Sequence, residues 1–179
     1  MRSRRWTPTH FRNIRICKIT QAKRAPAQFE IFCRRTEGRV LTTIRYVQKE
    51  DKEFWYRLDR HLPEPEFDEK VRNKQGYVLL KDGEPIGLLR YNLFWDNTPF
   101  CTMLFVDEKH QGKGYGKQLI GHWENEMKAQ GYGMVLTSTQ VDEPAQHFYR
   151  KAGYKDCGGF VIDVPGYEQP MEMFFIKKV

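Results

Sequence analysis

Hydrophobic and polar positions along residues 42–178 follow two periods in turn, one of about two residues and one of about 3.6. The first period is typical of half-buried strands and the second of amphipathic helices. The expected elements, in chain order, are a strand at 42–47, helices at 50–62 and 64–75, strands at 77–81, 86–95 and 99–106, a helix from the glycines at 111–116 to about 130, a strand at 133–139, a helix from 142 to 152, and two strands within 158–178. This order predicts a mixed sheet with helices packed against it.

Turn residues mark most of the expected boundaries. Pro63 and Pro65 separate the first two helices, because proline cannot continue a helix that precedes it. Asp82-Gly83 between two apolar runs is typical of a tight hairpin turn. A second turn is expected at Asp96-Asn97-Thr98, and the last two strands are expected around Pro165-Gly166-Tyr167.

Composition bounds the class of protein. A chain of 179 residues with 40% hydrophobic content has enough apolar material for one core. No run of about 18 apolar residues and no secretory signal pattern is present, so we expect a cytoplasmic protein with no membrane partner. The four cysteines, Cys17, Cys33, Cys101 and Cys157, lie far apart without a CxxC pair. They are interpreted as reduced, mostly buried thiols, with no metal site.

The positive charge is confined to the first residues. Residues 1–40 hold 11 Lys and Arg against two acids, whereas residues 41–179 hold 19 against 21. We therefore divide the chain into a basic arm at 1–40 and a domain at 41–179. The arm has three interpretations: a nucleic-acid or membrane-surface arm, a targeting leader, or an extension from a misplaced start codon or from cloning. Purine-rich codons would encode the triplet at 37–39 just before Val40 or Leu41, which favours the extension. Nucleic-acid binding is the weaker hypothesis.

Three glycines in HQGKGYG (110–116) precede an amphipathic helix. A helix N-terminus has unpaired N–H groups and a partial positive charge, and glycine lets an anion approach the backbone. The spacing GxGxG does not fit the dinucleotide fingerprint, and Gln111 and Gln118 break the Walker pattern. A phosphate site is predicted, and a turn that only reverses the chain is the alternative. On the helix that follows, Lys117, Glu124, Glu126 and Lys128 are expected away from the apolar face.

Two motifs carry a resemblance to a known family. LFVDEKHQGKGYGKQLI resembles the acyl-CoA motif of the GNAT superfamily of N-acyltransferases, through Leu104, Val106, Gln111, Gly114 and Gly116. DEPAQHFYRKAGY resembles the second GNAT motif through Ala145, Phe148, Tyr149, Gly153 and Tyr154, with Asp142 where Asn is usual. The resemblance covers residues 42–179 in element order and implies an α/β (α+β) fold: a mixed, mostly antiparallel twisted sheet of 6–7 strands flanked by about four helices.

The resemblance also implies the substrate and the residues that hold it. Acetyl-CoA is expected as the co-substrate, with its pyrophosphate on the backbone N–H groups of 111–116 and its pantetheine arm along 104–106. The expected contacts are Leu104, Phe105, Val106, Gln111, Gly112, Lys113, Gly114, Tyr115, Gly116, Lys117, Asp142, Ala145 and Tyr149. The two lysines, Lys113 and Lys117, are equally well interpreted as part of a solvated face.

Tyr149 is the predicted catalytic residue. Its position on the apolar stripe of its helix also suits a core residue, but a phenol has an ordinary pKa near that of a leaving thiol. The family resemblance favours a general acid that protonates the departing thiolate. Asp142 is expected to cap this helix, with Pro144 in the first turn and Gly153 just past its end. A carboxylate cannot donate hydrogen bonds, so one expected pantetheine contact is in doubt.

The acceptor is a primary amine, which must lose a proton before it attacks. The candidate bases are Asp96, Glu64, Glu66, Glu143, His110 and His147, and the sequence does not rank them. Acidic residues near the segments expected to bind the acceptor are Glu64, Glu66, Asp68, Asp163, Glu168 and Glu172, which suit a small cationic amine or a peptide amine. The predicted function is an N-acetyltransferase that works by direct attack in a ternary complex. A non-catalytic acyl-CoA sensor and a nucleic-acid binder acting through the arm are the alternatives, and a homodimer is left open.

Overall fold

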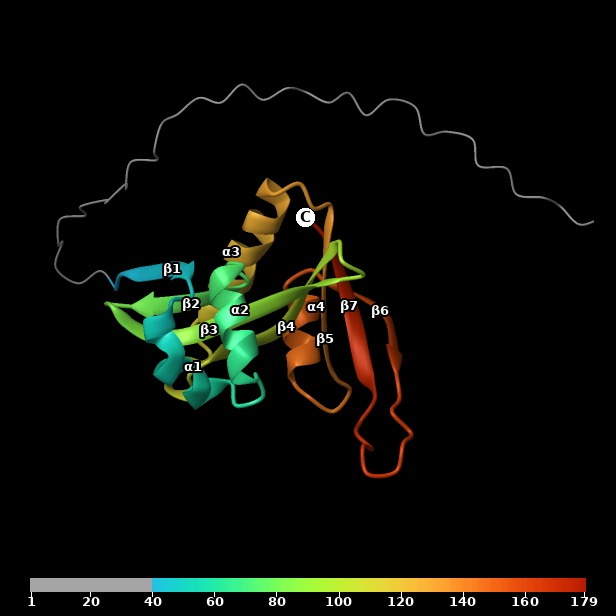
Figure 1. The fold of residues 1–179 in the computed structure, drawn as a ribbon. Helices are drawn as coiled ribbons and strands as arrows, with labels where there is room; N and C mark the ends of the chain where they lie inside the picture. Colours follow the sequence, from blue (N-terminus) through green and yellow to red (C-terminus); the bar gives the residue numbers. More distant parts are fainter. Residues whose placement is uncertain (1–39) are drawn as a thin grey trace, which may run out of the picture. The chain divides into compact units, whose positions relative to one another are not determined.

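The computed structural model describes residues 40–179, so the predicted basic arm, apart from Val40, lies outside the described residues. The described elements are β1 (Thr42–Tyr46), the 3₁₀ turn η1 (Lys49–Asp51), α1 (Lys52–Leu58), α2 (Glu64–Arg72), β2 (Gly76–Lys81), β3 (Glu84–Phe94), β4 (Thr98–Val106), η2 (Glu108–His110), α3 (Tyr115–Ala129), β5 (Met134–Gln140), α4 (Ala145–Lys151), β6 (Lys155–Phe160) and β7 (Glu172–Lys178) (Figure 1). Their order confirms the order expected from the sequence.

Seven strands form one sheet in the order β1-β2-β3-β4-β5-β7-β6. Every neighbouring pair is antiparallel except β4 and β5, which confirms a mixed, mostly antiparallel sheet. The parallel pair is short, since only Phe100 and Cys101 of β4 pair with β5. From Met103 to Val106, β4 is paired with β3 but not with β5. The two strands therefore separate and leave one edge of β4 unpaired.

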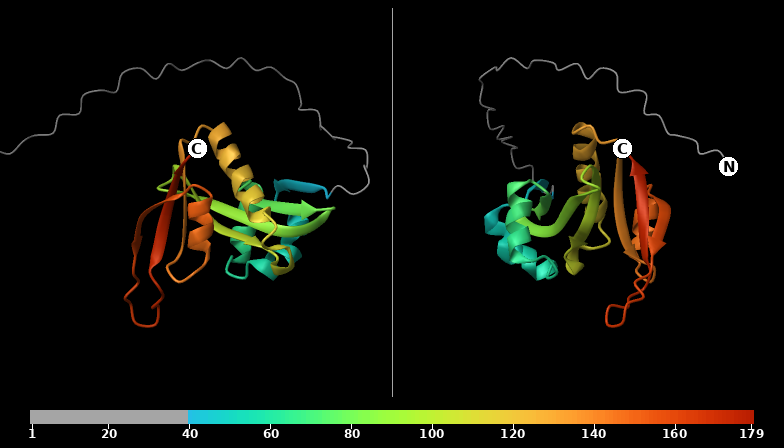
Figure 2. Two further views of the ribbon diagram at one scale, coloured as in Figure 1. Left: turned by 180° about the vertical axis from the view of Figure 1, so that it is seen from behind. Right: turned by 45° about the vertical axis from the view of Figure 1, so that its right-hand side comes forward.

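Alternating side chains of the central strands give the sheet two apolar faces. Val78 and Leu88 point to the face that α1 and α2 cover, with Trp55 and Phe67 of the two helices fully buried there. Tyr77, Leu79 and Leu89 point to the opposite face. That face packs against α3 and α4 through Leu119, Ile120, Trp123, Met127 and Tyr149. Figure 1 shows α1 and α2 nearest the viewer, and the reversed view in Figure 2 brings α3 and α4 forward.

The helix predicted over 50–62 is shorter than expected. It ends at Leu58, because Asp59 leaves helical geometry and turns inward. Its carboxylate is fully buried and pairs with Arg90 at 2.6 Å, and Arg90 also donates to the hydroxyl of Thr102. The ion pair compensates the two buried charges, and the last turn of the predicted helix does not form.

Other boundaries shift by a few residues. The second helix ends at Arg72 rather than at 75, and β6 begins at Lys155, before the predicted start at 158. The turn between β3 and β4 begins at Trp95, one residue early, with left-handed φ angles of 51° and 62° at Trp95 and Asp96. The turn predicted at Asp82-Gly83 is confirmed, with both residues at positive φ.

One prediction about burial was wrong. Glu124 was expected on the polar side of α3, but it is buried and pairs with Lys177 of β7 at 2.6 Å. Cys101 is buried as expected, whereas Cys157 lies exposed on the edge strand β6. Within residues 40–179 no three His, Cys, Asp or Glu side chains gather closely enough to hold a metal ion. None of the helices in this part of the chain is long and apolar enough to cross a membrane.

Candidate active site

The loop between β4 and α3 is held by its own short-range hydrogen bonds. Asp107 caps η2 by accepting from the amide of Lys109, and the side-chain amide of Gln111 donates to the carbonyl of Val106 at 2.8 Å. Gly112 and Gly114 then adopt φ angles of 72° and 84°. L-residues with a Cβ rarely adopt these angles, so the two glycines are required by the path of the chain. As a result, the helix begins at Tyr115, later than the predicted start at the first glycine.

This loop presents a run of free backbone donors. The first backbone hydrogen bond into α3 runs from the amide of Gln118 to the carbonyl of Gly114. Within the described residues, no amide from Gly112 to Lys117 has a hydrogen-bond acceptor. Because these amides sit at the positive end of a 15-residue helix, they form a site for an anion.

A cleft of about 570 Å³ opens beside these donors, and we call it the glycine-loop cleft. It is lined by Leu104, Phe105, Val106, His110, Gln111, Gly112, Gly114, Tyr115, Gly116, Lys117, Pro144, Ala145, Phe148, Tyr149, Lys151 and Ala152. One wall is the end of β4 that has no partner strand on the β5 side, and the other is α4. The cleft therefore combines basic side chains and free backbone N–H groups with apolar and aromatic side chains.

Eleven of the thirteen predicted contact residues line this cleft. Lys113 does not, because its ammonium turns back and donates to the carbonyl of Lys109 at 2.9 Å. Asp142 does not either, and its predicted capping role is wrong. The residue at the cap position of α4 is Pro144, which makes no side-chain hydrogen bond, and Asp142 is exposed.

The sequence missed several lining residues on α4 and just before it. Phe148 and Ala152 were interpreted as core residues only, yet both are partly buried and also face the cleft. Lys151 follows Phe148 by three residues, so helical spacing places it on the same side. This helical spacing from Phe148 was the sequence signal that could have identified Lys151 as a lining residue. His110 also lines the cleft, as its place in the loop indicated.

The end of α4 fixes the position of Tyr149. The amide of Tyr154 donates to the carbonyl of Tyr149 at 3.0 Å and that of Gly153 to the carbonyl of Arg150 at 3.0 Å, with Gly153 at a φ of 92°. These two bonds form a Schellman motif and confirm Gly153 as the residue past the helix end. The ring of Tyr149 packs against Tyr154 and Phe175, with centroids 5.6 and 5.8 Å away.

The hydroxyl of Tyr149 lies beside Thr137, which with Cys101 forms the last pair between β4 and β5. The side chain is 6% exposed, and burial raises the pKa of its phenol above the usual 10.0. The Cys101 thiol and the carboxylates of Glu143 and Glu172 act in the same direction, whereas a hydrogen bond with Thr137 opposes them. Burial also raises the pKa of Cys101 to about 12. At neutral pH Tyr149 is therefore a protonated phenol, which can donate a proton.

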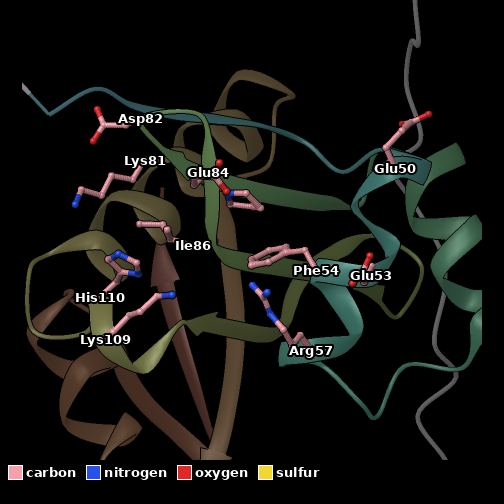
Figure 3. Close-up of a pocket in the computed structure, with 11 residues that line it drawn as sticks. Glu50, Glu53, Phe54, Arg57, Lys81, Asp82, Glu84, Ile86, Lys109 and His110 are labelled. Carbon is pink, nitrogen blue, oxygen red and sulfur yellow. The ribbon is translucent and has the colours of Figure 1, made fainter.

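A second cavity of about 650 Å³ adjoins the loop on its other side, and His110 lines both (Figure 3). Its cations, Arg57, Lys81 and Lys109, face the acids Glu50, Glu53, Asp82 and Glu84. Figure 3 shows Lys81, Lys109 and His110 on one side of it and Phe54 and Arg57 on the other. Burial and the charge of Lys81 lower the pKa of His110. Because this cavity has mixed charge and none of the free amides, the glycine-loop cleft is the better candidate site.

The sequence matches the acetyltransferase (GNAT) family model over residues 21–154. The chain belongs to the GNAT family of acetyltransferases. This membership confirms the class of transferase that the two motifs predicted. The glycine-loop cleft is built from the same two motifs.

Comparison with known proteins agrees with this family. The streptothricin acetyltransferase of Streptomyces lavendulae is 34% identical over 65 residues, which cover 36% of this chain and 34% of that protein. The chain thus matches about a third of the length of this relative. Ard1 from Thermoplasma volcanium superposes with a TM-score of 0.66 at 19% identity, over 77% of this chain and 97% of that one. Naa50 of Arabidopsis thaliana, in complex with the bisubstrate analogue CoA-Ac-MVNAL, superposes with a TM-score of 0.64 at 13% identity, over 77% of this chain and 99% of that one. At these identities the structural likenesses establish the fold.

Proposed function

We propose that this GNAT protein transfers an acetyl group from acetyl-CoA to the primary amine of a small cationic or peptide acceptor. The observation that carries the proposal is the continuity of the glycine-loop cleft. It runs from the free amides of Gly112 to Lys117, past the unpaired edge of β4, to the hydroxyl of Tyr149.

Each part of the cleft suits one part of the CoA molecule. The free amides bind the diphosphate, because they add several N–H donors to a helix dipole at one point. Lys117 and Lys151 line the cleft and add positive charge there. The pantetheine arm carries amides that pair with the edge of β4 between Leu104 and Val106, as an added strand does. Lys113 is left out of this set, since its ammonium is already bonded to a backbone carbonyl.

The chemistry is a direct attack within a ternary complex. The amine nitrogen attacks the thioester carbonyl, a C–N bond forms, and the tetrahedral intermediate then breaks its C–S bond. The departing thiolate takes the phenolic proton of Tyr149, and the proton that the amine loses restores the phenol through solvent. An N–H group on β4 stabilises the oxyanion of the intermediate. Two of the candidate bases have a described setting: Glu143 accepts a hydrogen bond from the hydroxyl of Thr139, and His147 is exposed. Neither observation selects one base for the amine.

Relatives support both substrates. The complex of Naa50 with a CoA-linked acetyl peptide concerns a protein of the same fold, and the streptothricin acetyltransferase is named for its acceptor. Neither identifies the acceptor of this chain. A cationic amine is favoured because two carboxylates, Glu143 and Glu172, lie at the end of β5, where β4 and β5 have separated.

A test combines binding and turnover. Acetyl-CoA should raise the melting temperature of the protein, and a panel of primary amines should release free thiol from acetyl-CoA in its presence. A protein that acetyl-CoA stabilises but that releases no thiol with any amine would act as a sensor. A protein that acetyl-CoA does not stabilise would contradict the proposal altogether.

A further inference from the structure

The sheet has a second surface beside the proposed reaction centre, on the face opposite α4. Phe174 alternates with Phe175, so it points away from the helix that Phe175 contacts. Phe94, Phe100, Phe174 and Phe160 form a continuous line across this face, and we call it the aromatic row. Neighbouring ring centroids lie 5.7, 5.9 and 5.6 Å apart. In Figure 1, β7 and β6 have no helix in front of them.

The register of the strands explains how the row spans the sheet. Ser138 of β5 pairs with Phe174, and its small side chain leaves room for Phe100 of β4 to approach Phe174. Trp95, which is 75% exposed, packs on Phe94 and extends the row beyond the sheet. At the other end, Phe160 on the edge strand is 45% exposed. The row is thus a partly open apolar surface.

One carboxylate stands in this surface. Glu172 pairs with Phe160 in the sheet, and directly paired residues share a face, so Glu172 lies on the same side as the row. It is half-buried, and within residues 40–179 its carboxylate has no hydrogen-bond or ion-pair partner. Glu172 also pairs with Gln140 at the end of β5, beyond the last residues that pair β5 with β4. The carboxylate at the end of the row therefore lies on the side of the sheet where β4 and β5 separate and where the cleft of the proposed reaction opens.

We propose that Glu172 binds the ammonium group of the acceptor and that the aromatic row holds a flat apolar part of the same molecule. This rests on the proposed function and adds the class of acceptor: a primary amine that carries an aromatic or planar group. A carboxylate and an ammonium form a charge-assisted hydrogen bond, and aromatic faces attract both planar groups and cations. Because Glu172 lies where β4 and β5 have separated, the bound ammonium is held near the carbonyl that it attacks once it has lost a proton.

A second copy of the chain is the other occupant that an open apolar face suits. A homodimer across the aromatic row would bury Glu172 without a cation, which is costly for an unpaired carboxylate. An acceptor that brings its own positive charge removes this cost. The charge of Glu172 therefore favours the small cationic ligand.

The experiment uses three probes that separate charge from ring. The first, 2-phenylethylamine, has both features, 2-phenylethanol has only the ring, and ethylamine has only the charge. Binding of each to the CoA-loaded protein is measured by calorimetry, and acetyl transfer from acetyl-CoA is measured by thiol release. The variants are Glu172→Gln, Glu172→Asp and Phe174→Leu. Glu84→Gln serves as control, since Glu84 is exposed at the start of β3.

The wild-type protein should bind 2-phenylethylamine at least about tenfold more tightly than either partial probe, as expected for a charge-assisted hydrogen bond combined with ring contact. Glu172→Gln should weaken binding of the amine about tenfold or more and leave 2-phenylethanol unaffected. Phe174→Leu should weaken both ring-bearing probes, Glu172→Asp should keep part of the preference for charge, and Glu84→Gln should change nothing.

The outcomes separate this inference from the proposed function. Amines that are acetylated with the same KM by Glu172→Gln and the wild type would overturn the inference and leave the function standing. Binding that depends on Glu172, but without acetyl transfer, would support the inference and contradict the function. A stable dimer that Phe174→Leu dissociates, without amine binding, would overturn the inference in favour of a second copy.

Discussion

At the scale of single residues, burial keeps the phenol of Tyr149 protonated. A phenol at the surface would keep a pKa near the ordinary value for tyrosine. Tyr149, in contrast, is only 6% exposed at the junction of β4 and β5. Because burial raises its pKa, the neutral form of the phenol persists to higher pH than in an exposed tyrosine, although the phenol becomes a weaker acid. Burial likewise raises the pKa of the Cys101 thiol.

Replacing Tyr149 with Phe removes one hydroxyl and keeps the ring contacts. We expect kcat to fall by roughly a factor of 100, within the range of general acid catalysis, while the affinity for acetyl-CoA changes less than about twofold. Steady-state kinetics and calorimetry measure the two quantities. Turnover equal to that of the wild type would remove Tyr149 from the mechanism.

The raised pKa of Tyr149 also predicts a pH dependence. An acid works in its protonated form, so its contribution is present below its pKa and is lost as the pH rises through it. The ratio of wild-type kcat to that of Tyr149→Phe should therefore stay constant between about pH 7 and about pH 10, the ordinary value for tyrosine. A ratio that declines toward one within this range would mean that the phenol ionises early, contrary to this account.

At the scale of elements, the glycine loop and α3 act together. Gly112 and Gly114 make the turn that exposes the amides, whereas Gly116 lies within the helix. A Cβ on Gly116 would meet the ring of Phe148 at 3.5 Å and the side chain of Leu104 at 3.7 Å, which is ordinary contact. The first two glycines are thus needed for conformation, and the third keeps the cleft open.

Two glycine substitutions should have opposite effects on stability. Gly114→Ala forces a Cβ into left-handed geometry at φ 84°, so it should cost about 1–2 kcal/mol and abolish the thermal stabilisation by CoA. Gly121→Ala, in the middle of α3 with nothing near its Cβ, should stabilise by about 0.5–1 kcal/mol and keep the response to CoA. Thermal unfolding with and without CoA measures both. A Gly114→Ala protein that CoA stabilises fully would contradict the assigned role of the loop.

Element order and most of the cleft could be predicted from the sequence because local signals carry them. Periodicity indicates strands and helices, and the two motifs place the loop and α4 on opposite sides of one site. Long-range pairing could not be predicted. Arg90 draws Asp59 out of the first helix, and Lys177 draws Glu124 into the core, although neither pair is near in sequence. The ammonium of Lys113 bonds to a backbone carbonyl, and Asp142 does not cap α4. Both outcomes depend on local geometry that residue type does not determine.

At the scale of the whole molecule, Lys177 ties three elements together behind the site. Its ammonium pairs with Glu124 of α3 at 2.6 Å and donates to the carbonyl of Ala152, at the end of α4, at 2.8 Å. Lys177 itself belongs to β7. This contact sets how α4, which carries Tyr149, lies against the sheet and α3.

Replacing Lys177 with Met should leave the Glu124 carboxylate buried without a cation. We expect a loss of roughly 2–3 kcal/mol in the free energy of unfolding, less than for a fully buried pair because Lys177 is about a quarter exposed. In the double variant Lys177→Met/Glu124→Leu most of this loss should be recovered. Urea denaturation measures both, and a single variant as stable as the double one would show that the pair has no such role.

The central claim is that the free amides of Gly112 to Lys117 hold the diphosphate of CoA. Its most direct test is a titration followed by the backbone amide resonances of these residues, with CoA and, for comparison, with pantetheine, which lacks the diphosphate. The account predicts large shifts of the Gly112, Gly114 and Gly116 amides with CoA and small ones with pantetheine. Amide resonances that stay in place at saturating CoA, or that move equally with pantetheine, would contradict it.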